Sequence, residues 1–147
     1  MKLHGFPKPE HLTLQRDIDA LFAAGSHSAA SYPVRAVWRT AEWSGHGPKV
    51  KVLVSVSKRK FKHAVDRNRA KRQMREAYRL NKHILDAPVD AGDAPFALHI
   101  GFIWLADKPQ PSRRVHSRLV NLLRNIAESL ERTHAKAKPQ GETPTTP

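Results

Sequence analysis

The chain has 147 residues, which is enough for one domain with a buried core. It carries 26 lysine and arginine residues against 13 acids, a formal net charge of +13. A compact domain with this excess of positive charge is typical of proteins that bind a polyanion, nucleic acid first. The absence of cysteine excludes disulfides, thiolate metal sites and a thiol nucleophile.

The ends of the chain indicate one domain and a tail. The N-terminal sequence MKLHGFPKPEHL lacks the continuous apolar core of a signal peptide, and no run approaches the about 18 apolar residues of a membrane span. We therefore expect a cytoplasmic protein with no membrane partner. Residues 134–147 contain no apolar side chain larger than Ala or Pro, which predicts a disordered tail after a single domain over 1–133.

The first expected element is a short helix. Leu14, Ile18, Leu21 and Phe22 recur at helical spacing, and Gly25 stands where a helix usually stops. Two strands are expected next, because apolar β-branched residues alternate in YPVRAVWRT (32–40) and in KVKVLVSVS (49–57). In the second strand the valines share one face, which we assign to the core. The opposite face is mixed and can meet solvent or a ligand.

The second half of the chain predicts a helix, a strand and a helix. The helix should span about residues 67–85, and a loop marked by Pro and Gly follows it. FALHIGFIWLA (96–106) is apolar on both sides, as in a strand buried on both faces. Ser112 can cap a closing helix with an apolar stripe. The order α-β-β-α-β-α predicts an α+β protein, a two-layer α/β sandwich with helices packed on a small sheet.

Residues 58–83 hold most of the excess charge. Eleven of them are Lys or Arg, and only Asp66 and Glu76 oppose these. On a helix Arg67, Lys71 and Arg75 lie one above another, and like charges at this spacing destabilise an isolated helix. Phosphates between the guanidinium groups would reverse that effect, because arginine binds phosphate in a bidentate way. The segment therefore predicts a phosphate-binding face, with a solvated charge run as the alternative.

At these residues the sequence resembles a known family. SVSK (55–58), AVDRNRAKR (64–72) and REAYR (75–79) resemble the signature of the bacterial ribonuclease P protein subunit, a strand ending in VSK followed by an RNRxKRxxRE helix. The resemblance covers about residues 11–132. It implies an α/β sandwich with a left-handed βαβ crossover, and an RNA-binding subunit of the ribonucleoprotein endonuclease that removes the 5′ leader from precursor tRNA.

The resemblance also implies which partners the protein has and which of them carries out catalysis. The partners would be ribonuclease P RNA and precursor tRNA, with no small-molecule substrate. Catalysis would reside in the RNA, which would hold most of the Mg²⁺, and the protein alone would be inactive. The alternative function is a structural RNA-binding protein, such as a ribosomal or assembly protein.

Two sets of site residues follow from the resemblance. Contact with the ribozyme RNA is implied for Lys58, Arg59, Lys60, Arg67, Asn68, Arg69, Lys71, Arg72, Arg75 and Arg79. A cleft for the leader, between the first helix and the outer sheet face, would be lined by Ile18, Phe22, Ala36, Trp38, Ser55, Lys71 and Arg75. Core packing is an equal alternative for Phe22 and the favoured one for Ile18.

The sequence offers no sign of a catalytic or metal centre in the protein. The nine histidines form no HxH, HExxH or i, i+4 pair. A two-metal nuclease needs several converging carboxylates, and the basic segment has only Asp66 and Glu76. A membrane-surface protein is disfavoured, because Met74 and Ala77 provide only a small apolar face.

Overall fold

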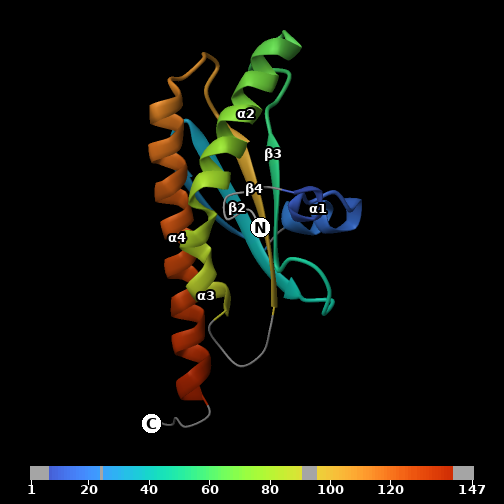
Figure 1. Cartoon of the computed structure of the whole chain (residues 1–147), viewed down its shortest axis with the longest axis vertical. Coiled ribbons are helices and arrows are strands. Elements are labelled where there is room, and N and C mark those ends of the chain that lie inside the picture. The colour runs from blue at the N-terminus through green and yellow to red at the C-terminus, as the bar shows by residue number, and fades with distance from the viewer. Residues whose placement is uncertain (1–6, 24, 91–95, 141–147) are drawn as a thin grey trace.

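The computed structural model describes residues 7–23, 25–90 and 96–140 (Figure 1). Its strands are β1 (His27–Ser31), β2 (Val34–Glu42), β3 (Val50–Ser55) and β4 (Phe96–Trp104). Its helices are the 3₁₀ turns η1 (Lys8–Glu10) and η2 (Lys82–Leu85), with α1 (Gln15–Leu21), α2 (Ala64–Asn81), α3 (Asp86–Asp90) and α4 (Ser112–Gln140). None of the described helices is long and apolar enough to span a membrane.

The four strands form one mixed sheet in the order β1-β2-β4-β3. β2 pairs antiparallel with β1 and β4, whereas β3 and β4 are parallel and are joined through α2. In Figure 1 β3 and β4 run upward behind α2, and β4 lies to the left of β3, so this crossover is left-handed. The predicted α+β sandwich is confirmed.

The larger core lies between the sheet and the pair α2 and α4. Leu98, Ile100, Phe102 and Trp104 of β4 project into it and are fully buried. The valines at 52 and 56 pack in the same core, and those at 50 and 54 lie at its margin. α4 contributes the expected apolar stripe of Val115, Leu119, Leu122, Leu123, Ile126 and Leu130.

The opposite sheet face carries α1 over a second, smaller cluster. Leu21 of α1 is fully buried there with Leu12 and Val37. The close approach depends on Gly101, since a Cβ at this position would lie 3.1 Å from Cδ2 of Leu21 and 3.3 Å from Cζ of Phe22. Both faces of β4 are therefore covered, as its apolar sequence predicted.

The structure also differs from the sequence-based expectations. The strand β1 was not expected, because HSAAS has no apolar alternation and forms its ladder only with β2. The long helix begins at Ala64 and ends at Asn81, and residues 82–85 form a 3₁₀ turn. Helix α4 continues to Gln140, beyond the expected domain end at 133, while 141–147 lie outside the described residues.

Candidate nucleic-acid interface

Helix α2 has two chemically different faces. Its buried side chains are Ala70, Gln73, Met74, Ala77 and Tyr78. The ring of Tyr78 packs on Phe102 of β4 with 6.1 Å between centroids, and burial raises the pKa of its hydroxyl far above the usual value. The helix is thus fixed to the sheet through one face, as predicted, so its other face is presented rigidly to the outside.

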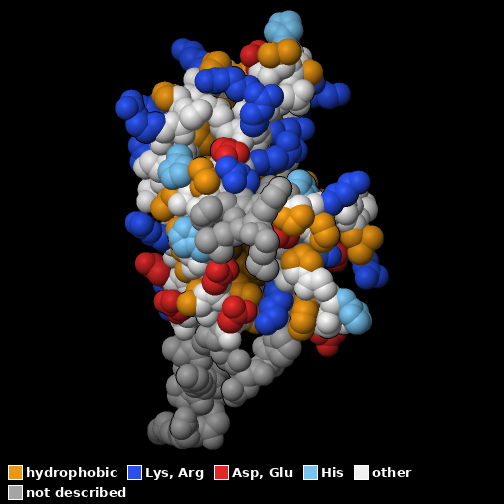
Figure 2. Space-filling view, in the orientation of Figure 1, with side chains coloured by type: hydrophobic (Ala, Val, Ile, Leu, Met, Phe, Trp, Pro, Cys, Tyr) orange, Lys and Arg blue, Asp and Glu red, His pale blue; other side chains and the backbone are white. Residues whose placement is uncertain are grey.

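The outer face and the loop before α2 carry cations without acidic partners. Within the described residues, no carboxylate lies within 4.0 Å of the cationic groups of Lys58, Arg59, Lys60, Lys71, Arg72 and Arg75. Figure 2 shows lysine and arginine side chains gathered over the first turns of α2 and the start of α4. We call the lysine and arginine side chains of residues 58–75 the basic stripe. Its uncompensated charge makes it a ready surface for phosphate groups.

Three arginines of the predicted set also make contacts within the protein. Nη1 of Arg67 donates to the carbonyl oxygens of Phe61 (2.8 Å) and Lys62 (2.9 Å), which ties the basic loop to the first turn of α2. Arg69 reaches the carbonyl of Gln110 at 3.5 Å. Arg79 forms an ion pair with Glu76, and its hydrogen bond lowers the pKa of the Glu76 carboxyl.

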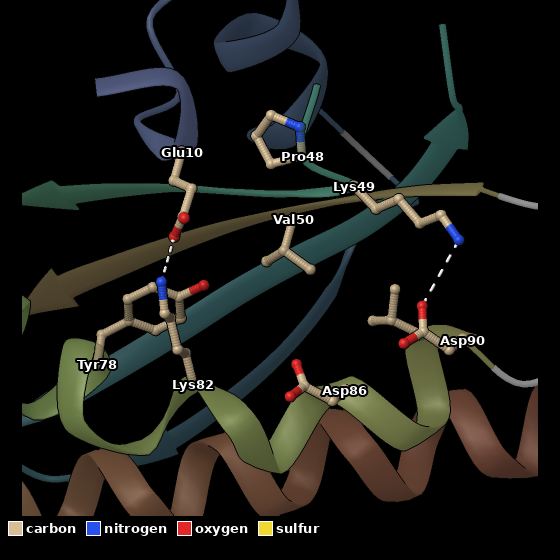
Figure 3. Close-up of a pocket in the computed structure, with 9 residues that line it drawn as sticks. Glu10, Pro48, Lys49, Val50, Tyr78, Lys82, Asp86 and Asp90 are labelled. Atoms are coloured by element: carbon tan, nitrogen blue, oxygen red, sulfur yellow. Dashed lines mark hydrogen bonds and ion pairs between the residues drawn. The ribbon is translucent and has the colours of Figure 1, made fainter. Parts of the chain in front are cut away.

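The far end of α2 is electrically balanced. Figure 3 shows Lys82 reaching Glu10 at 2.8 Å and Lys49 reaching Asp90 at 3.5 Å, around a cavity of about 240 Å³. Both groups of the Lys82–Glu10 pair are only 19% exposed. The pair therefore fastens the N-terminal segment to the end of α2. Along α2, the described cations with no acid within 4.0 Å therefore lie between Arg67 and Arg75.

The face that carries α1 holds part of the predicted leader-binding set. Phe22 is 47% exposed at the edge of α1, and Ile18 and Ser55 are half-buried. A small cavity of about 190 Å³ lies between the N-terminal segment and β3 and is lined partly by Leu53 and Arg75. Arg75 thus lies between the basic stripe and this second surface.

Two residues of that set lie on the wrong face. Ala36 and Trp38 are buried in the larger core, on the side of the sheet opposite α1. Trp38 stacks there on His27 with 5.7 Å between ring centroids. The prediction that they line the α1 cleft is wrong, because side chains alternate along a strand and a shift of one residue reverses the face.

The α1 side of β2 carries Arg35, Val37 and Arg39, followed by Ala41. Val37 pairs with Gly101 in the sheet register, and it is buried with Leu21. Arg35 donates to the hydroxyl of Ser28 at 3.1 Å, from Nη2. The set predicted from the sequence named Ala36 and Trp38 and so omitted the two arginines on the other face of β2. Their alternation with Val37 was the available signal.

Known proteins match this fold and these motifs. The family model described as Ribonuclease P matches residues 6–99. The ribonuclease P protein component of Porphyromonas gingivalis is 36% identical over 123 residues, which cover 84% of this chain and 87% of that protein. That of Chlorobium phaeobacteroides is 38% identical over 93 residues, covering 63% and 64%.

Solved structures agree with the architecture. The RNase P protein from Thermotoga maritima superposes with a TM-score of 0.61 at 24% identity, covering 80% of this chain and 97% of that one. The Staphylococcus aureus RNase P protein gives a TM-score of 0.60 at 20% identity, covering 80% and 94%. These structures show that the fold is shared, while the sequence matches show membership of the family. The chain belongs to the ribonuclease P protein component family.

Proposed function

We propose that this subunit of ribonuclease P, the endoribonuclease of tRNA 5′ processing, uses two surfaces for two RNAs. The basic stripe of α2 binds ribonuclease P RNA, and the face carrying α1 binds the 5′ leader of precursor tRNA. The observation that carries the proposal is a stripe of cations, with no acid of the described residues within 4.0 Å, on a helix whose other face is anchored in the core. The proposed RNA-binding domain is the one expected over 1–133.

The stripe suits a folded RNA for electrostatic reasons. Each phosphate neutralised by Lys or Arg releases condensed counterions, which supplies most of the sequence-independent affinity. The proposed contacts come from Lys58, Arg59, Lys60, Arg67, Asn68, Arg69, Lys71, Arg72, Arg75 and Arg79. Arg79 should contribute least of these, since Glu76 already compensates its charge. Arg67 has a second task, because it also orders the loop that holds Lys58 to Lys62.

The α1 face suits a single strand. An exposed aromatic ring can stack on an unpaired base, and nearby cations can follow the backbone. Phe22 supplies the ring, Ile18 and Ser55 lie nearby in the proposed cleft, and Arg75 and Lys71 supply charge at its β3 edge. Arg35 and Arg39 join the proposed set in place of Ala36 and Trp38.

Catalysis and most of the Mg²⁺ are assigned to the RNA in this proposal. The described residues contain no group of three or more His, Asp or Glu side chains able to hold a metal ion. Glu76, an acid beside the stripe, already forms an ion pair with Arg79. In this proposal no chemical step uses a metal held by the protein. The protein would bring the leader to the ribozyme and reduce repulsion between the two RNAs.

A leader-binding surface predicts a selective defect. Phe22→Ala should weaken the binding of the holoenzyme to precursor tRNA by at least about fivefold and leave mature tRNA unaffected, because a stacked base contributes about 1–3 kcal/mol. Leu14→Ala is the matched control, since Leu14 is also half exposed and precedes α1. Equal losses on both tRNAs would refute leader binding and favour a structural RNA-binding protein.

A further inference from the structure

A groove of about 370 Å³ separates α2 from α4 on the face shown in Figure 2. Ala77 and Leu80 form its apolar side, and Leu80 is one of the large apolar residues left exposed, at 36%. Arg113 and His116 of α4 line the other side. Neither Leu80 nor these two residues belongs to the surfaces proposed above.

Gln73, on the α2 side of the groove, has a buried side-chain acceptor with no partner among the described residues. Nε2 of Gln73 donates to the carbonyl of Gln110 (2.8 Å) and to Oγ of Ser112 (3.0 Å). A carbonyl can only accept, so this contact fixes the orientation of the amide. Oε1 of Gln73 is then left buried with no hydrogen bond from any described residue. An unpaired buried acceptor is costly, which favours a donor arriving from outside.

The opposite wall offers a donor and a cation. Nδ2 of Asn81 donates to the carbonyl of Ala77 (2.8 Å) and lies 3.2 Å from Nε2 of His116. Since that amide nitrogen can only donate, Nε2 of His116 accepts in this contact, which leaves Nδ1 as the N–H donor of the ring. Arg113 is exposed, and no acid of the described residues lies within 4.0 Å of it.

We propose that this groove receives one unstacked nucleobase of ribonuclease P RNA. The inference rests on the proposed RNA binding and adds a third contact to it. The flat base would lie against Leu80 and Ala77, its edge would meet the acceptor of Gln73 and the donor of His116, and Arg113 would hold the adjoining phosphate. Proteins read RNA mainly through such splayed bases, and the adjoining basic stripe brings the backbone close.

A cross-link tests the proposal directly. The chain has no cysteine, so Leu80→Cys accepts a thiol-specific photo-cross-linker at one position, with exposed Asn125→Cys of α4 as control. With the full chain bound to ribonuclease P RNA, Leu80→Cys should cross-link to one or two unpaired nucleotides. Cross-links to paired nucleotides, or none above the control, would overturn the proposal. If the unmodified chain does not bind the RNA, the proposed function itself fails.

A binding measurement gives an independent test. Making the cross-linked nucleotide abasic should weaken binding of the unmodified chain about tenfold. The same lesion should have little effect on a Leu80→Ala variant. Arg113→Ala should weaken binding more than Arg124→Ala, an equal loss of charge farther along α4. If the abasic lesion weakened binding equally for the unmodified chain and Leu80→Ala, the base would lie outside the groove. Equal losses of affinity for Arg113→Ala and Arg124→Ala would lead to the same conclusion.

Discussion

Replacing Arg72 with alanine should weaken binding to ribonuclease P RNA and flatten its salt dependence. Arg72 is exposed on α2, and no acid of the described ranges lies within 4.0 Å of it. One lost phosphate contact reduces the slope of log K against log salt by about 0.9 for a duplex with the charge density of B-DNA, or about 0.7 for a single strand. Over a fourfold change in salt this makes the affinity loss about 3.5-fold larger at about 50 mM than at about 200 mM.

The assay is a titration of labelled RNA with each variant at several salt concentrations. Arg124→Ala is the control, because it removes the same charge from an exposed position on α4. It should shift the affinity slightly and leave the slope close to that of the unmodified chain. An unchanged slope for Arg72→Ala would remove this residue from the interface. Equal changes in the two variants would mean that overall charge, and not the basic stripe, governs binding.

Three further predictions concern residues whose roles the structure defines. Trp38→Ala should lower the free energy of unfolding by about 3–5 kcal/mol in denaturant titrations, since Trp38 is a core residue; selective loss of leader binding at unchanged stability would contradict this. The double variant Glu76→Gln with Arg79→Gln should flatten the salt slope less than Arg72→Ala does, because it removes a neutral pair; an equal flattening would mean that Arg79 contributes as much to binding as Arg72. Burial lowers the pKa of His99, so the unfolded chain binds more protons than the folded chain and the stability should fall as the pH drops below about 6.5. The variant His99→Gln should therefore show a weaker pH dependence of the melting temperature. An identical pH dependence in the variant and the unmodified chain would refute this prediction.

The sequence predicted the elements whose side chains have one clear periodicity. In α2 the small and apolar residues recur at helical spacing opposite the cations, so both faces could be predicted. The same holds for the valines of β3 and the stripe of α4. The strand β1 could not be predicted in this way, since HSAAS has no apolar alternation and becomes a strand only through pairing with β2.

The candidate site was harder to predict, because it depends on tertiary geometry. β2 carries apolar side chains on both faces, with Ala36 and Trp38 toward one core and Val37 toward the other. Its pattern therefore does not say which face meets α1. The placement of Leu80 and His116 on opposite sides of one groove likewise arises only when α2 and α4 pack.

Reconstitution tests the central claim most directly. The purified chain is added to a bacterial ribonuclease P RNA at low Mg²⁺, and removal of the leader from precursor tRNA is measured beside the chain alone and the RNA alone. We predict cleavage at the 5′ end of the mature tRNA only when both are present, with a weaker effect for Arg72→Ala. Cleavage by the chain alone, or no stimulation of the RNA, would contradict a protein that binds RNA while the RNA cuts.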